Sequence, residues 1–226
     1  GKTWRIGFLA GAGRPQNGLP PAPLRAGLAD LGYAEGSNVV YEGRWAEGSF
    51  DRFPALAEEL VKLRVDAIVV IGWVATRAVK RATSTIPIVI AGVGDAVESG
   101  LATSLARPGA NLTGMSDMEA ELSSKRLQLL KETVPKAARM AVLWNQDDLG
   151  MTLRYRNIDA AARSLGVAVQ ALGVREPDDF EVAFSAMKRE RPDALFLVTD
   201  ALTNLNRKRV IEFAAAHRIP AMYENG

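Results

Sequence analysis

The chain has 226 residues, enough for one large domain or two lobes of about 110 residues each, and its composition is 48% apolar and 24% charged. This composition excludes a disordered chain, and the absence of cysteine excludes disulfides, zinc–thiolate sites and thiol catalysis. A net charge of +2 without a clustered basic stripe argues against nucleic-acid binding, and no apolar run reaches the roughly 20 residues of a membrane span.

The first half of the chain alternates short apolar runs with helical patterns. We expect strands at 4–10, 38–45, 67–71 and 86–91, helices at 24–31, 50–64, from 73 onward and at 97–105, and an extended piece at 112–115. The stretch Val65–Asp95 is a strand–helix–strand unit. A crossover of this kind joins parallel strands, so the pattern predicts a parallel sheet buried on both faces.

The ends of the two strands in this unit are the first candidate site. Ligands of open parallel sheets bind beyond the carboxyl ends of the strands, which nominates the loops Trp73–Thr76 and Gly92–Asp95. Trp73 is a candidate for stacking on a planar solute, and the alternative is a tryptophan that packs within its lobe. Thr76 and the N–H group of Ala75 are candidates for holding a carboxylate, with a simple helix cap as the alternative.

Other residues near strand ends extend this candidate site. Asp95 is a candidate partner for a ligand ammonium group, and its alternative role is to cap a following helix. Gly94 would let the backbone approach a ligand, as would Gly13 in the loop 11–18 after the first strand. Arg14 in the same loop is a candidate for a ligand carboxylate, with a plain surface position as the alternative.

The pattern of the first half restarts after Pro135. We expect strands at 139–145, 167–174, within 191–200 and at 219–223, and helices at 122–134, 151–165, 178–189 and 205–217. The stretch that starts at Arg191 repeats the plan of the stretch that starts at Arg64, which predicts two similar lobes. Asn145 and Asp200 each close a strand. Asn145 is a candidate amide contact, and Asp200 is a candidate ammonium partner or a helix cap.

Two lobes of this design define the predicted architecture. We predict an α/β fold of two Rossmann-like lobes with parallel sheets, residues 1–114 and 115–226, with a ligand cleft between them. Helix N-termini that line such a cleft favour anionic groups, and hinged closure around a small ligand is the known behaviour of the design.

A long motif in the first lobe resembles one protein family. The run IPIVIAGVGDAVESGLATSLARPGANLTGMS, residues 86–116, is similar to the signature of bacterial ABC-transporter substrate-binding proteins of the tryptophan and tyrosine importer type. Further matches are RIGFLAG, LRAGLADLGYAEGSNVVYEGRWAEG, ATRAVKRATSTIPIV and RPDALFLVTDALT. Ala96 stands where the pattern has proline and Ala110 where it has glycine, and the resemblance spans nearly the whole chain.

The resemblance implies a periplasmic-binding-protein type I architecture and an extracytoplasmic solute receptor for an ABC importer. It implies an amino acid or related aromatic compound as the solute, the membrane permease subunits as partners, and a monomer exported to the periplasm with its signal peptide removed. Family members continue past the motif IPAMYE with a Gly-rich segment and helices that return to the first lobe. We therefore expect a chain that is truncated at its C-terminus and lacks this return segment.

A regulatory domain and an enzyme are the two alternatives to a binding protein. A ligand-sensing regulatory domain of the same two-lobe fold is the main alternative, and a DNA-binding segment before the first strand would mark it. An enzyme is not expected, because no nucleophile–base pair, metal cluster or phosphate loop is visible, so we assign no catalytic residue, metal or cofactor. A dinucleotide site is disfavoured because Gln16 occupies the third glycine position of the G-x-G-x-x-G pattern.

Overall fold

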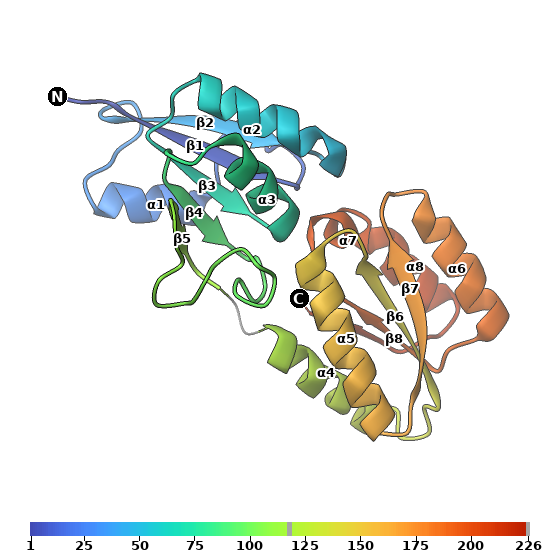
Figure 1. The fold of residues 1–226 in the computed structure, drawn as a ribbon. Helices are drawn as coiled ribbons and strands as arrows, with labels where there is room; N and C mark the ends of the chain where they lie inside the picture. The colour runs from blue at the N-terminus through green and yellow to red at the C-terminus, as the bar shows by residue number, and fades with distance from the viewer. Residues whose placement is uncertain (117–118, 225–226) are drawn as a thin grey trace. The chain divides into compact units, whose positions relative to one another are not determined.

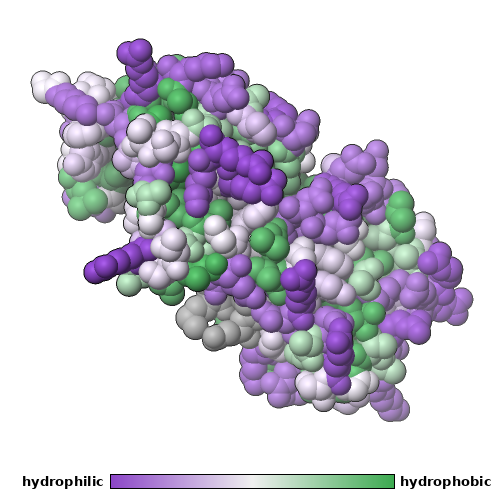
Figure 2. Space-filling model, in the orientation of Figure 1, coloured by the Kyte–Doolittle hydropathy of each residue, from purple (hydrophilic) through white to green (hydrophobic). Residues whose placement is uncertain are grey.

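The computed structural model describes residues 1–116 and 119–224, and the chain divides into two compact units, Gly1–Ser116 and Asp117–Gly226. Each unit is a parallel β-sheet with helices packed on it (Figure 1). Hydrophilic side chains cover most of the visible surface, with smaller apolar patches between them (Figure 2). No helix in the described part of the chain combines the length and apolar character needed to cross a membrane.

The first unit carries a five-stranded sheet in the order β2-β1-β3-β4-β5, with all neighbours parallel. Its strands are β1 (Trp4–Ala10), β2 (Val39–Trp45), β3 (Ala67–Ile71), β4 (Ile88–Ala91) and β5 (Leu112–Gly114). Its helices are α1 (Ala22–Asp30), α2 (Phe53–Lys62) and α3 (Trp73–Ala82), with the 3-10 helix η1 (Phe50–Arg52) before α2. Strand order reverses between β1 and β3, and in open α/β sheets such a switch point is where ligands bind.

The two faces of the first sheet are covered unequally. On the face that packs against α2 and α3, Ile68 and Ile88 are fully buried. On the α1 face, Val69 and Val89 stay half-buried and Ile71 is 38% exposed. Helix α1 has no buried residue, and an apolar hollow of about 200 Å³ is lined by Trp4, Ile6, Leu28, Tyr33 and Val39. Because parallel sheets are normally covered on both faces, this is the less protected side of the first core.

Gly114 allows β5 to pair with β4. Its φ is +139°, and a Cβ at this position would lie 2.2 Å from the Ile90 carbonyl oxygen and 2.5 Å from the Ile90 nitrogen. The backbone of a paired strand cannot move aside, so we expect Gly114→Ala to detach β5 and lower the free energy of unfolding by about 3 kcal/mol. Urea denaturation measures this loss. Gly27→Ala on α1, where a Cβ meets no atom within 4 Å, is the matched control. An equal effect of both substitutions would contradict the explanation.

The second unit carries a four-stranded sheet in the order β7-β6-β8-β9, again with all neighbours parallel. Its strands are β6 (Arg139–Asn145), β7 (Ala168–Val174), β8 (Ala194–Leu197) and β9 (Ala221–Tyr223). Its helices are α4 (Glu119–Thr133), α5 (Leu149–Ser164), α6 (Asp179–Glu190), α7 (Ala201–Leu205) and α8 (Arg207–Ala216). The switch point of this sheet lies between β6 and β8.

Both faces of the second sheet are buried. Met140 and Val142 of β6 belong to an apolar cluster that includes Leu127 of α4 and Ile158 of α5, all of them fully buried. Leu143, which points to the opposite face, is fully buried as well. The unbroken apolar runs of β6 and β8 reflect this two-sided burial, which is typical of a parallel sheet.

The predicted repeat of the two lobes is confirmed, and it extends to the backbone. Arg64 and Arg191 both adopt a left-handed conformation, with φ of 51° and 50°. Two residues later, Asp66 accepts the Arg5 N–H at 2.8 Å, and Asp193 accepts the Arg139 N–H at 2.9 Å. These hydrogen bonds lower the pKa of both carboxyls and fix the start of the first strand in each unit.

Three predicted helices differ from the structure. The helix expected at 97–105 is wrong, because carbonyls of this segment bind side chains of α3: Trp73 Nε1 donates to the Ser99 oxygen and Lys80 Nζ to the Leu101 oxygen. The helix expected at 50–64 is divided into η1 and α2. The helix expected at 205–217 is two helices, α7 and α8, that meet at Asn206.

Candidate functional site

The carboxyl edge of the first sheet contains a helix N-terminus without a side-chain cap. Gly72 directly follows β3 and is the N-cap of α3, with φ of 91° and ψ of 153°, a conformation essentially restricted to glycine. Within the described residues, α3 has no side-chain hydrogen bond at its N-cap, because glycine offers no acceptor there. Unpaired N–H groups and the helix dipole together favour an anion at this position.

Trp73 is the first residue of α3 and is only 6% exposed. Its Nε1 donates to the Ser99 carbonyl oxygen at 3.2 Å, and the Arg77 guanidinium carbon lies 4.9 Å from the centre of the indole. The side chain therefore anchors the turn-rich segment after β4 to α3. These contacts agree with the packing alternative, and stacking of Trp73 on a solute stays a prediction.

Thr76 and Ala75 are buried in the first turns of α3, with exposures of 0% and 1%. The Thr76 hydroxyl donates to the Gly72 carbonyl oxygen at 2.8 Å, and this hydrogen bond stabilises the first turn of the helix. A direct role of either residue with a solute carboxylate stays a prediction. Through this hydrogen bond, Thr76 fixes the glycine that turns the strand into the helix.

The loop after β4 is closed on itself by hydrogen bonds. Asp95 accepts the N–H groups of Val97 and Glu98, both at 2.8 Å, so it caps a turn where a helix was expected. The Ser116 hydroxyl donates to the Gly94 carbonyl at 2.8 Å and accepts the N–H of Ala96 at 3.1 Å. Gly94 has a φ of 73°, as a tight turn requires.

The loop after β1 is the least anchored part of the candidate site. Gly13 and Arg14 are exposed. The Arg14 guanidinium carbon lies 5.6 Å from the ring centre of Trp45, the buried residue that ends β2. Trp45 also packs beside Phe8, with ring centres 6.0 Å apart. The end of β2 thus offers a cation over an aromatic ring.

The carboxyl edge of the second sheet holds a buried polar network. Asn145, at the end of β6, is 0% exposed, and its amide nitrogen donates to Asp200 at 2.6 Å. Asp200 also accepts the Thr203 N–H at 2.9 Å and caps α7 in a capping box. Burial raises the pKa of Asp200, and the hydrogen bonds from Thr203 and Asn145 oppose that rise.

Asp148 is a second carboxylate at this edge, and it is buried. It is 4% exposed and caps α5 by accepting the Met151 N–H at 3.1 Å. Burial, and secondarily the nearby charge of Asp200, raises the pKa of Asp148 to about 7. The guanidinium of Arg154, one turn into the same helix, partly opposes this rise.

Glu224, directly after β9, is a further carboxylate at this edge. Its side chain is 2% exposed and accepts the Thr199 N–H at 2.8 Å and the Ser123 hydroxyl at 3.0 Å. Arg154 and Arg126 lie 3.4 and 3.5 Å away. No pattern in the sequence pointed to Glu224 or to either arginine.

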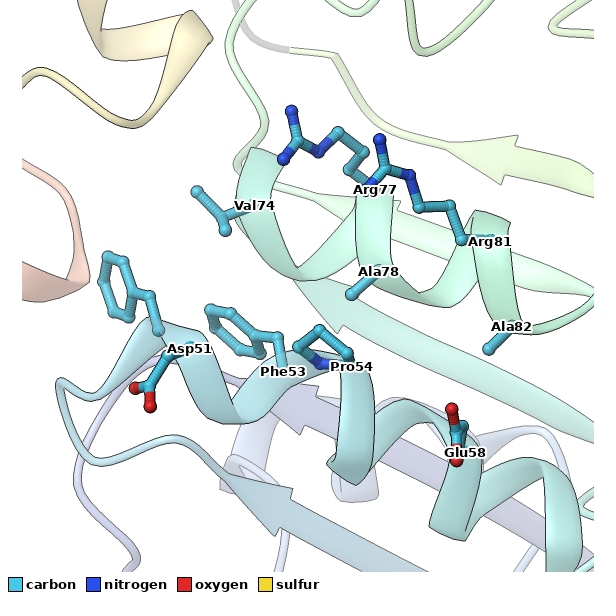
Figure 3. A pocket seen from close by; sticks show the side chains of 10 residues that line it. Asp51, Phe53, Pro54, Glu58, Val74, Arg77, Ala78, Arg81 and Ala82 are labelled. Atoms are coloured by element: carbon cyan, nitrogen blue, oxygen red, sulfur yellow. The ribbon is translucent and has the colours of Figure 1, made fainter.

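A separate groove of about 340 Å³ runs between α2 and α3 (Figure 3). Ala78 and Ala82 of α3 turn toward α2, where Pro54 lies, and Arg77 and Arg81 extend along the outer side of α3. The groove follows the flanks of two helices, whereas every candidate residue described above lies at or next to the carboxyl edge of a sheet.

A known protein family matches most of the chain. Residues 22–225 match the family described as "ABC transporter substrate binding protein". The chain belongs to this family. The match covers both units from the start of α1 onward, and the resemblance seen in the sequence is confirmed. Proteins of this family are substrate-binding proteins and not enzymes.

One relative by sequence and two solved structures show what this chain is similar to. A tyrosine-binding protein of Clostridioides difficile is 28% identical over 193 residues, which are 85% of this chain and 55% of the relative, so the chain spans about half the length of that relative. A conserved domain protein of Vibrio cholerae is 25% identical, with a TM-score of 0.88 over 97% of this chain and 73% of that one. A Streptococcus pneumonia ABC domain solved with L-Trp is 22% identical, with a TM-score of 0.86 and the same coverage of both chains. These structures confirm the predicted α/β fold of periplasmic-binding-protein type I.

Proposed function

We propose that the chain is the extracytoplasmic solute-binding component of an ABC importer. In this proposal a small, aromatic, amino-acid-like solute with a carboxylate binds between the two units, and hinge closure traps it. The permease subunits in the membrane are the partners, and the protein acts as an exported monomer. The named tyrosine-binding relative and the L-Trp complex of a structural neighbour support this class of solute.

The contrast between the two sheet edges carries the proposal. The first edge presents the uncapped N-terminus of α3, which suits a carboxylate. The second edge presents the carboxylates of Asp148 and Asp200, which suit an ammonium group. In the second unit the helices after β6 and β8 are capped by their own aspartates. An α-amino acid carries both charges on one carbon, so it complements the two edges together.

The site requires no chemistry beyond binding. A buried carboxylate gains more from an ammonium partner than an exposed one, because the pair lies in a lower dielectric. A solute that engages both units favours the closed form over the open one, since only the closed form makes both sets of contacts. This differential affinity would allow an importer to recognise the loaded protein.

The test is a thermal-shift series of tryptophan analogues. We expect L-tryptophan at about 100 times its Kd to stabilise the protein by about 2.7 kcal/mol, a rise in Tm of several degrees. Tryptamine lacks the carboxylate and indole-3-propionate lacks the ammonium, so each should shift Tm by far less. Equal shifts with all three compounds would refute recognition of both charges. Stabilisation by sugars alone would refute the solute class.

A further inference from the structure

Glu224 gathers four donors from three parts of the second unit. Its carboxylate accepts the hydroxyl of Ser123 on α4 and the backbone N–H of Thr199 after β8. It also forms ion pairs with Arg126 on α4 and Arg154 on α5. Ser123 is 101 positions away in the sequence and Arg154 is 70 positions away, so these contacts bring remote segments together.

The burial of Glu224 separates it from direct solute contact. With 2% of the side chain exposed, both oxygens are enclosed by protein donors. Burial raises the pKa of Glu224, and the Thr199 N–H, followed by Arg154, opposes the rise. A buried carboxylate with several directional donors fixes the positions of those donors, because a lost contact leaves a desolvated charge.

The donors belong to elements that matter for the proposed site. Thr199 precedes Asp200, which caps α7 and binds Asn145. Arg154 is shared with Asp148, whose pKa it lowers. Ser123 and Arg126 lie on α4, the first helix of the second unit, which starts two residues after the unit boundary at Asp117. Glu224 therefore joins the candidate solute edge to the helix that leads into this unit.

We propose that Glu224 is a positioning residue that couples the order of the Thr199–Asp200 segment to the order of α4. Its effect on binding rests on the proposed function. A solute that orders the Thr199–Asp200 segment would also order α4, and an ordered α4 would in turn order that segment. Closure of the two units and affinity for the solute would then depend on one buried carboxylate that never contacts the solute.

Hydrogen exchange on the whole chain, with and without L-tryptophan, tests the proposal. Glu224→Gln keeps an oxygen for the Thr199 N–H but leaves both arginines without its charge. We expect amides of 122–130 and 198–205 to exchange about tenfold faster, while α6 is unchanged. We also expect the Kd for L-tryptophan to rise about tenfold, since a charge-assisted contact that orders the edge is lost.

Two controls keep the outcomes distinct. Ser123→Ala removes one neutral donor and should raise exchange in the same two segments to a smaller extent, even if Glu224→Gln folds poorly. Glu181→Gln, on the exposed side of α6, should leave both segments unchanged. Faster exchange at 198–205 without any change at 122–130 would overturn the coupling. If the wild-type chain binds no L-tryptophan, the proposed function fails for this probe, and exchange in the unliganded protein still decides the role of Glu224.

Discussion

Arg154→Leu is expected to lower the free energy of unfolding by about 3–5 kcal/mol, because it leaves the buried carboxylate of Glu224 without its most buried cation. The Arg154 side chain is 7% exposed and Glu224 is 2% exposed, so water cannot replace the lost charge. Asp148 loses the same guanidinium. Urea denaturation at pH 7 measures the loss.

A control on the same helix isolates this effect from the loss of an arginine as such. Arg163 pairs with Asp159 on the exposed side of α5, and its side chain is 77% exposed. Arg163→Leu should therefore cost about 0.5 kcal/mol or less. Combining Arg154→Leu with Glu224→Leu should recover part of the stability, because the buried charge of Glu224 is then gone, while the Thr199 N–H and Arg126 still lose this acceptor. A double variant as unstable as the sum of the two single variants would contradict the ion-pair explanation.

Asp148→Asn is expected to stabilise the protein at pH 8 and to leave its stability nearly unchanged at pH 4. Burial raises the pKa of Asp148 from 3.8 to about 7, so the folded chain keeps a proton that the unfolded chain has already lost between these values. The folded state binds more protons in this window, and stability therefore falls as pH rises through it. Asparagine cannot ionise, and its side-chain oxygen can still accept the Met151 N–H.

The size of this difference follows from the two pKa values. At about 1.4 kcal/mol per pKa unit the upper limit is about 4 kcal/mol, and we expect about 2–4 kcal/mol at pH 8. Thermal unfolding of both proteins from pH 4 to pH 8 provides the comparison. Asp147→Asn is the matched control, because the Asp147 side chain is 58% exposed. A gain from Asp148→Asn that is the same at every pH would exclude titration of Asp148 as its cause.

The elements that the sequence predicted well are those with strong local patterns. The apolar run 67–71, the glycine at 72 and the helix from 73 form β3, the N-cap and α3 as expected. The repeat of Arg64–Asp66 at Arg191–Asp193 predicted two similar lobes, because a turn and strand start with fixed backbone geometry demand the same residue types twice.

The elements that were missed depend on contacts between distant residues. The segment 97–105 has helical spacing, but Trp73 and Lys80 bind its carbonyls and hold it in turns. Glu224 follows a three-residue strand with no local signal, and its partners lie on α4, on α5 and after β8. Pairing of this buried glutamate with an arginine was foreseeable only from the general rule that buried charges are paired.

The sequence predicted the positions of the candidate residues better than their roles. Their placement near strand ends followed from the parallel topology, and the structure does put Asn145 and Asp200 in contact. The sequence could not decide between a ligand role and a structural one, because the same residue types serve both. Trp73 and Thr76 show this plainly: each donates to a backbone carbonyl within its own unit.

The central claim is that a zwitterionic aromatic solute contacts the carboxyl edges of both sheets. The most direct test is an NMR titration of the labelled chain with L-tryptophan, following the backbone amides. The account predicts shifts at residues 72–76 of the first unit and at 145–150 and 198–201 of the second, saturating together with one Kd. Shifts confined to the groove between α2 and α3, or to one edge alone, would contradict it.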